Sequence, residues 1–238
     1  MKYSILLPYY KRPELKFTLT SFLHHYSNRS DYEVIIVEDV KDNEDDHKQL
    51  VDIISQFENK INIICFMDMV KSYCTPNKYN MAFEKSTGQF VVLSSPEVVH
   101  KTNILKGLDG EFNNNANNYI VCSCKFLPRK KDGKPDVWYQ HSKYRNKLYN
   151  FCSALSRQNY INVGGFDTRY CNGIGFEDNN FKMRIMISSI NIKIRDDLVT
   201  MHMEHDKEYQ KDKALYQINK DLFASQCSNN SFLNRRYE

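Results

Sequence analysis

The sequence predicts an α/β protein in which helices cover both faces of a mostly parallel sheet. Short apolar runs that are typical of buried strands alternate with segments of helical spacing over roughly the first hundred residues. The chain of 238 residues is long enough for one sizeable domain. Its content of 41% hydrophobic and 26% charged residues is typical of a soluble globular protein.

Four strands and three intervening helices account for this first part of the chain. Each strand is a continuous apolar run, the first ends at Pro8, and Gly88 introduces the fourth. The predicted strands are residues 3–7, 34–37, 61–67 and 90–93. The predicted helices are residues 15–23, 50–57 and 77–85.

The second half of the chain is less regular. We expect a helix at 104–112, a strand at 119–126, further strands at 190–194 and 198–199, and a charged helix with a loose tail after residue 206. Residues 128–149 are basic and aromatic without periodicity, which indicates a long excursion from the core. The predicted division is therefore a domain of residues 1–206, with halves 1–100 and 101–206, and a C-terminal segment 207–238.

Composition limits the possible partners and locations. No apolar run approaches the ~20 residues of a membrane span, and the N-terminal run is too short for a secretory signal, so we expect a cytoplasmic protein. The net charge of +4 is mild and dispersed, which argues against nucleic acid as a partner. The seven cysteines contain no Cys-x-x-Cys pair, and we expect reduced thiols rather than disulfides or a zinc site.

Polar residues follow three of the predicted strands. Pro8, Tyr9 and Tyr10 follow the first, Glu38 and Asp39 end the second, and the run 94–97 follows the fourth. Because ligands of such sheets bind beyond the carboxyl ends of the strands, one site could use all three segments.

The most distinctive segment is residues 164–178, which hold four of the eight glycines and end in Glu177-Asp178. Glycines at this density indicate a shaped loop. Helical spacing follows, so we expect both carboxylates at a helix N-terminus, where the helix dipole favours negative charge and a carboxylate could act on a substrate. The alternative interpretation is a glycine-rich turn followed by an acidic helix cap.

These features together resemble the GT-A glycosyltransferases, especially the family 2 type, over roughly residues 1–206. Gly164-Gly165-Phe166-Asp167 with the following run 173–178 is similar to a galactosyltransferase-type segment in which a Glu-Asp pair opens a helix below the acceptor. The resemblance implies that Pro8, Tyr9, Tyr10 and Arg12 hold the nucleotide base, with Tyr10 bordering uracil. It further implies that Asp39 accepts a hydrogen bond from the base or ribose and that Lys78 and Asn80 lie near the diphosphate.

The same resemblance implies a divalent metal, Mn²⁺ or Mg²⁺, on an Asp-x-Asp sequence after the fourth strand. Here Ser95-Pro96-Glu97 occupies that place, so Ser95 replaces the first carboxylate and Glu97 stands for the second. A distal ligand would be His202 or His205. Since residues three apart on an extended segment point to opposite faces, we expect one of them to bind, with His202 preferred.

The implied activity is inverting transfer of a sugar from a nucleotide sugar, a UDP-sugar in the first place, to a hydroxyl of a glycan or glycoconjugate, as in polysaccharide biosynthesis. Asp178 would be the general base and Glu177 would orient the acceptor or donor. Two alternatives remain: a nucleotidyltransferase of similar layout, and a non-catalytic nucleotide- or sugar-binding module. A dinucleotide-binding oxidoreductase is poorly supported, because no Gly-x-Gly-x-x-Gly follows the first strand.

Overall fold

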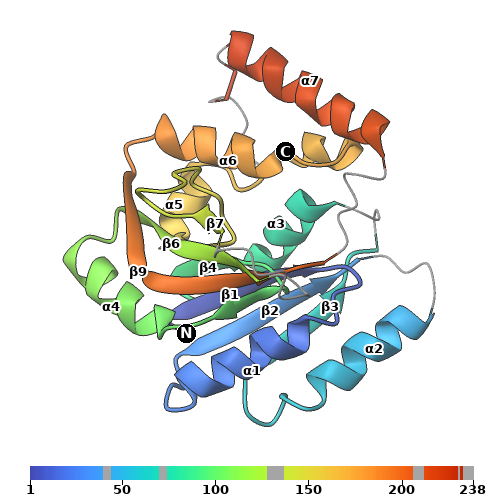
Figure 1. Ribbon diagram of the computed structural model, residues 1–238, viewed down its shortest axis with the longest axis vertical. Helices are drawn as coiled ribbons and strands as arrows, with labels where there is room; N and C mark the ends of the chain where they lie inside the picture. The colour runs from blue at the N-terminus through green and yellow to red at the C-terminus, as the bar shows by residue number, and fades with distance from the viewer. Residues whose placement is uncertain (40–43, 70–73, 128–136, 206–211, 230, 233–238) are drawn as a thin grey trace.

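The computed structural model describes residues 1–39, 44–69, 74–127, 137–205, 212–229 and 231–232. The described strands form one nine-stranded sheet in the order β3-β2-β1-β4-β8-β6-β9-β5, with β7 paired to β6 (Figure 1). The strands are β1 (Tyr3–Tyr9), β2 (Tyr32–Glu38), β3 (Ile63–Met67), β4 (Phe90–Ser94), β5 (Val98–His100), β6 (Asn118–Leu127), β7 (Trp138–Gln140), β8 (Cys152–Ser156) and β9 (Asn191–Met203). The helices are α1 (Leu15–Tyr26), α2 (Glu44–Ile54), α3 (Thr75–Lys85), α4 (Ile104–Asn114), α5 (Arg157–Asn162), α6 (Glu177–Met186), α7 (Lys213–Asn229) and the 3₁₀ helix η1 (Thr168–Asn172).

The direction of the strands brings several carboxyl ends to one edge. β1 is parallel to β2 and β4, β2 to β3, and β6 to β9. β8 lies between β4 and β6 and is antiparallel to both, so β6 and β9 run in the same direction as β1. The last residues of β1, β2, β4 and β9 therefore meet at the same edge, which confirms the predicted α/β architecture.

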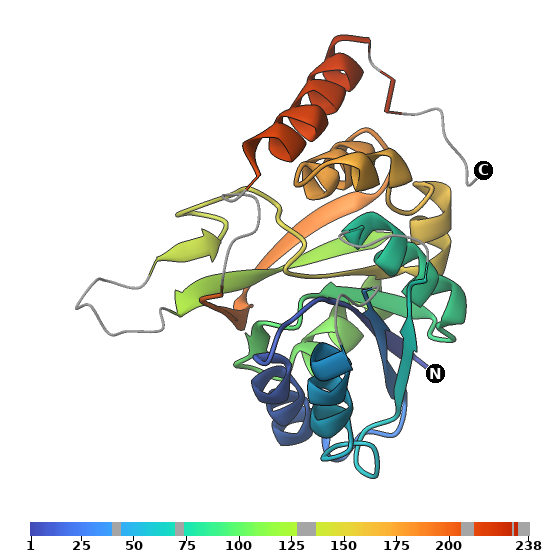
Figure 2. The same cartoon turned by 90° about the vertical axis from the view of Figure 1, so that its right-hand side faces the viewer.

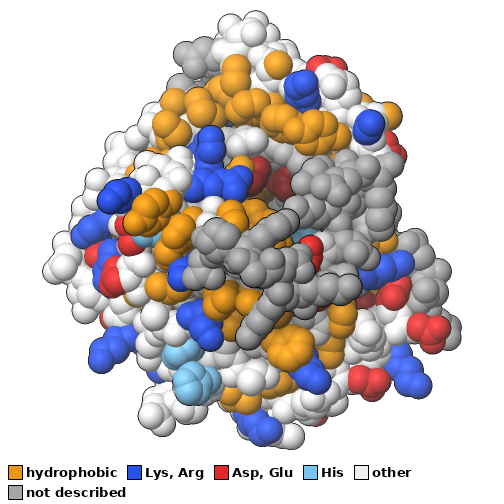
Figure 3. All heavy atoms as spheres, viewed as in Figure 1, with side chains coloured by type: hydrophobic (Ala, Val, Ile, Leu, Met, Phe, Trp, Pro, Cys, Tyr) orange, Lys and Arg blue, Asp and Glu red, His pale blue; other side chains and the backbone are white. Residues whose placement is uncertain are grey.

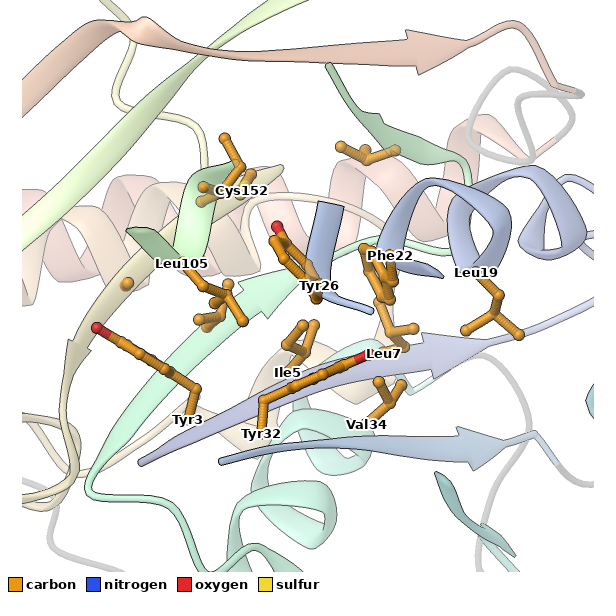
Figure 4. Close-up of a cluster of buried hydrophobic side chains, with 14 of the residues drawn as sticks. Tyr3, Ile5, Leu7, Leu19, Phe22, Tyr26, Tyr32, Val34, Leu105 and Cys152 are labelled. Atoms are coloured by element: carbon orange, nitrogen blue, oxygen red, sulfur yellow. The ribbon is translucent and has the colours of Figure 1, made fainter. Parts of the chain in front are cut away.

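Strands β1, β2 and β4 bury both faces, whereas the edge strand β3 is partly exposed. In β1, Ile5 and Leu7 pack with α1, α2 and α4 on one face, whereas Leu6 packs with α3, α5 and α6 on the other. This alternation follows from the two-residue period of a strand. Because helices cover both faces (Figures 1 and 2), the strands consist of continuous apolar runs rather than alternating ones. Figure 4 shows part of the first core, with Tyr26 of α1 packed above β1 and β2.

Helix α7 lies outside the two helical layers, beyond α6 in both ribbon views. It is fixed to the glycine-rich segment by Asn219, whose side-chain nitrogen donates to the carbonyl oxygens of Tyr170 at 2.9 Å and Gly175 at 2.7 Å. A Cβ atom at Gly173 would lie only 2.4 Å from the carbonyl oxygen of Leu215. The predicted C-terminal helix therefore packs directly on the segment that carries Glu177 and Asp178.

The prediction of only reduced cysteines is wrong. Cys74, directly before α3, and Cys171 in η1 form a disulfide with Cα atoms 4.5 Å apart, while five other cysteines are free. Disulfides are rare in reducing compartments, so this pair does not favour the predicted cytoplasmic location, which stays a prediction. No described helix is long and apolar enough to cross a membrane.

Candidate active site

A cleft of about 550 Å³ opens at the edge where the strands end. This volume lies in the range typical of small-molecule sites. Residues that the sequence placed in a single site line it from both halves of the chain. They are Pro8, Tyr9, Tyr10, Arg12, Asp39, Lys78, Ser95, Glu97, Glu177, Asp178, His202 and His205.

Glu97, His202 and His205 form a compact cluster in this cleft. The Glu97 carboxylate oxygen Oε1 lies 3.6 Å from Nε2 of His202 and 3.4 Å from Nε2 of His205. One ligand atom from each residue lies within 4.8 Å of the others. The backbone sets this proximity, because β5 pairs antiparallel with β9 and the Met203 N–H donates to the Glu97 carbonyl oxygen at 2.9 Å.

The expectation that His202 and His205 point to opposite faces of an extended segment is not met. His202 is the penultimate residue of β9, but the strand ends at Met203 and His205 lies beyond it. The alternation rule therefore does not reach His205, and the chain turns so that both rings lie 5.1 Å apart, centroid to centroid.

The donor set of this cluster fits a divalent cation. One carboxylate oxygen and two imidazole nitrogens can bind Mn²⁺, while Mg²⁺ prefers ligand sets made of oxygen. Glu97 and His202 are buried and His205 is partly buried, so they form a recessed rather than a surface group. The loop after β1 also reaches the cluster, since Nε of Arg12 lies 3.8 Å from Oε2 of Glu97. Arg12, which was predicted to bind the nucleotide base, therefore lies beside the Glu97 cluster.

Asp39 and Lys78 form a buried ion pair on another wall of the cleft. Nζ of Lys78 lies 3.0 Å from Oδ1 of Asp39, and each side chain is only 3% exposed. Asp39 follows β2 and Lys78 is in α3, so the pair joins a strand end to the helix behind it. The charge of Lys78 is therefore balanced by Asp39 within the protein.

Asn80 does not take the predicted place near a diphosphate. It is not among the described residues that line the cleft. Its Nδ2 donates to the Phe166 carbonyl oxygen at 2.8 Å, and its Oδ1 accepts from the Phe166 N–H at 2.8 Å and from the Tyr160 hydroxyl at 2.9 Å. Asn80 instead fixes the glycine-rich segment to α3.

Glu177 and Asp178 begin α6, as the sequence predicted, and both line the cleft. Two glycines with left-handed backbone, Gly164 and Gly165, come before this turn, and Phe176 itself has φ of +68° at the helix start. Figure 3 shows acidic side chains recessed below the band of hydrophobic side chains that crosses the region of α6 and α7.

The two carboxylates differ in their surroundings. Burial, and next the charge of Asp178, raises the pKa of Glu177 to about 7. Burial also raises the pKa of Asp178, but this carboxylate accepts a hydrogen bond from the Asn179 N–H at 2.7 Å, which favours its charged form. The two carboxylates therefore share a site in which burial raises both pKa values, and Glu177 takes up a proton near neutral pH.

The residues that form one wall of the cleft were not predicted individually. Tyr139, Arg145, Tyr149, Asn150 and Phe151 line it from the segment between β7 and β8. The basic and aromatic composition of this segment was visible, but without periodicity it did not indicate which side chains face the cleft. Thr75 and Pro76 at the start of α3 were also missed.

Comparison with known proteins agrees with this geometry. Residues 134–207, which include Glu177, Asp178, His202 and His205, match a family model described as the N-terminal domain of galactosyltransferase. S. aureus TarS 1–349 in complex with UDP has a TM-score of 0.68 at 16% identity, covering 89% of this chain and 63% of its own. The chain has the GT-A fold.

Two further GT-A structures are similar. The mannosyltransferase PcManGT from Pyrobaculum calidifontis, in complex with GDP-Man and Mn²⁺, has a TM-score of 0.68 at 13% identity over 100% of this chain and 66% of its own. GalNAc-T7 with UDP, GalNAc and Mn²⁺ has a TM-score of 0.67 at 12% identity, over 86% and 44%. The comparisons confirm the predicted resemblance to GT-A glycosyltransferases, although this chain spans less than two thirds of the length of each of these three solved chains. No curated protein sequence matches it.

Proposed function

We propose that this GT-A chain is a metal-dependent, inverting glycosyltransferase that moves a sugar from a nucleotide sugar, a UDP-sugar in the first place, to a hydroxyl acceptor on a glycan or glycoconjugate. The observation that carries the proposal is the opening of two chemical groups into one cleft: the Glu97, His202 and His205 cluster, and the Glu177–Asp178 pair. The similar structures with UDP or GDP-Man support a nucleotide-sugar donor, and two of them contain Mn²⁺.

The walls of the cleft suit the parts of such a donor. Tyr10 and Asp39 lie at the ends of β1 and β2, where a base and ribose would bind in an α/β sheet. Ser95 and Glu97 follow β4 and line the cleft, and Glu97 belongs to the cluster. A divalent cation held by Glu97, His202 and His205 would act as a Lewis acid toward the departing diphosphate.

Asp178 is the proposed general base. As the acceptor hydroxyl oxygen forms its bond to the anomeric carbon, its proton passes to the Asp178 carboxylate. The bond from that carbon to the diphosphate oxygen breaks, and the diphosphate leaves with the electron pair. One displacement inverts the anomeric configuration, and it needs the base and the leaving group on different sides of the sugar. Asp178 belongs to α6 and His202 to β9, so the proposed base and the proposed metal site come from different elements of the cleft, which supports this arrangement.

Glu177 has a different proposed role. Because its pKa is raised to about 7, it is partly protonated at neutral pH and can donate as well as accept a hydrogen bond. It can thus hold a sugar hydroxyl in either direction beside the Asp178 carboxylate. A raised pKa in a cleft is typical of groups that take part in proton transfer.

A non-catalytic nucleotide-sugar binder is the second candidate. Ser95 in the place of a carboxylate favours it, since the described cluster then has one acidic ligand. Turnover separates the two candidates. The protein is incubated with UDP-, GDP- and TDP-sugars and Mn²⁺, and both binding and slow hydrolysis are measured. Binding with hydrolysis supports the transferase, binding without hydrolysis or transfer to any glycan acceptor supports the binder, and no binding of any nucleotide sugar contradicts both.

A further inference from the structure

Arg145 is a cleft residue for which the sequence suggested no role. It belongs to the segment between β7 and β8, which is held by several hydrogen bonds. The backbones of His141 and Arg145 pair at 3.0 and 3.1 Å, and the buried Gln140 accepts the Lys147 N–H at 3.1 Å. The Ser142 N–H also donates to Asp196 at 2.9 Å. Arg145 is thus carried by a fixed hairpin.

The guanidinium of Arg145 is fixed by two aromatic rings of the same wall. Its central carbon lies 5.5 Å from the ring centroid of Tyr139 and 5.8 Å from that of Tyr149. Both distances are within the range of a cation–π interaction. All three residues line the cleft. The rings therefore hold the positive charge in place without neutralising it.

The described carboxylates of the cleft leave Arg145 without an ionic partner: no carboxylate oxygen among the described residues lies within 4.0 Å of its guanidinium. Two other cleft cations differ in this respect. Lys78 is paired with Asp39 at 3.0 Å, and Arg12 lies 3.8 Å from Glu97. Figure 3 shows Lys and Arg side chains next to the recess that holds acidic side chains. A fixed and unneutralised guanidinium in a cleft is suited to an anionic group of a ligand.

The position of Arg145 indicates which anionic group of a ligand it would bind. The ring of Tyr139, which contacts the guanidinium, also contacts the ring of His202 with 5.1 Å between centroids. Phe151 completes this contact, with its centroid 4.9 Å from that of His202. Arg145 is thus separated from the metal-binding cluster by a single aromatic layer.

The balance of charges in the cleft also indicates a diphosphate as this anionic group. A divalent cation on Glu97 and two neutral imidazoles would keep one net positive charge. The diphosphate gains a negative charge when its bond to the sugar breaks, and fixed positive groups that meet this charge lower the barrier. Lys78 is already balanced by Asp39 and Arg12 lies beside Glu97, whereas Arg145 pairs with none of the described carboxylates and can supply more positive charge.

We propose that Arg145 binds the diphosphate of the nucleotide donor and stabilises the charge that develops on it as it leaves. This inference rests on the proposed function. Loss of a hydrogen bond between charged groups costs about 1.5–3 kcal/mol, which corresponds to roughly 10–100-fold in affinity. Arg145→Gln removes the charge, and Arg145→Lys keeps it but loses the paired donors of guanidinium.

Calorimetric titration of UDP and of uridine, each with Mn²⁺, tests the proposal without turnover. For Arg145→Gln we expect UDP to bind about 10–100-fold more weakly while uridine binds as in wild type, with Arg145→Lys intermediate. Lys143→Gln, an exposed neighbour in the same hairpin, should leave both affinities unchanged. Unchanged UDP affinity in Arg145→Gln, or an equal loss for UDP and uridine, would overturn the role of Arg145. A wild-type protein that binds no UDP would instead contradict the proposed function, and this inference with it.

Discussion

His202 donates its Nδ1 proton to the backbone carbonyl oxygen of Met203 across 2.9 Å. A carbonyl oxygen only accepts hydrogen bonds, so Nδ1 carries a proton, and in the neutral ring the lone pair is then on Nε2, which faces Glu97. The bond fixes both the tautomer and the direction of the ring before any metal binds. The backbone of β9 therefore orients His202 toward Glu97, as the proposed metal site requires.

We predict that His202→Phe abolishes tight Mn²⁺ binding by the protein alone. The phenyl ring can keep the packing on Tyr139 and Phe151 but has no nitrogen. The loss should exceed the roughly 10–100-fold that follows removal of a hydrogen bond to a metal ligand. Electron paramagnetic resonance of free Mn²⁺ measures it, and His24→Ala, in an exposed position of α1, is the control. Equal Mn²⁺ binding by His202→Phe and wild type would remove His202 from the metal site.

We predict that Asp178→Asn lowers kcat by about 10²–10⁴-fold while the affinity for UDP stays near that of wild type. The amide keeps the shape of the side chain but cannot take the acceptor proton. Glu177→Gln is the matched variant, because it changes the neighbouring carboxylate in the same turn. For Glu177→Gln we expect a smaller decrease in kcat and a larger increase in KM for the donor or acceptor sugar. If Glu177→Gln lost turnover and Asp178→Asn kept it, the two roles would be exchanged.

The predicted parts of the fold share a physical cause. Strands such as β1 and β2 are continuous apolar runs because helices bury both of their faces, and such runs are visible in a sequence. β8 was not predicted, although it lies in the centre of the sheet. Its small residues, Cys152, Ser153 and Ala154, are buried between β4 and β6 but form neither a long apolar run nor a clear alternation.

The candidate site likewise contains residues that could be predicted from the sequence and residues that could not. Asp178 could be placed because it begins a helix that the sequence marks clearly, whereas Glu97 and His202 were proposed from the resemblance to GT-A glycosyltransferases. Arg145 could not, because its position depends on how a hairpin without periodicity folds back over the cleft. The disulfide was missed for a related reason: Cys74 and Cys171 are 97 residues apart and meet only through the packing of η1 on α3.

We predict that the stability of the protein falls as pH rises through the titration of Glu177. Its pKa is about 7 in the folded protein and near the ordinary value of 4.5 in the unfolded chain. Between these values the folded state binds more protons, so the free energy of unfolding decreases with rising pH. The Tm of Glu177→Gln, relative to wild type, should therefore rise from pH 4.5 to pH 7.5 when both are measured without metal by calorimetry.

Glu58→Gln, which changes an exposed glutamate, is the control for this pH series. It should give a Tm difference that stays flat over the same range. A flat difference for Glu177→Gln as well would show that this carboxylate titrates in the folded protein as it does in water.

We predict that Asp39→Asn destabilises the protein by about 3–5 kcal/mol, because it leaves the buried ammonium of Lys78 without its partner. The double variant Asp39→Asn with Lys78→Met should recover most of this loss, since neither charge then remains buried. Asp197→Asn breaks an exposed pair with Arg195 and should cost less than about 1 kcal/mol. Denaturant unfolding measures all three, and an Asp39→Asn variant as stable as Asp197→Asn would contradict the role of the pair.

We predict that Cys171→Ser destabilises the oxidised protein by about 2–5 kcal/mol, because the disulfide closes a long loop between α3 and η1. A thiol assay on the unfolded, unreduced protein should find five free thiols, and seven after reduction. Reductant should lower the Tm of wild type to that of Cys171→Ser and leave the variant unchanged. Cys227→Ser, which removes an exposed free thiol, is the control and should behave as wild type. Seven thiols before reduction, or a wild-type Tm that reductant does not change, would show that Cys74 and Cys171 are not joined in solution. The packing of η1 on α3 and α7 would then have to hold it beside the cleft without the disulfide.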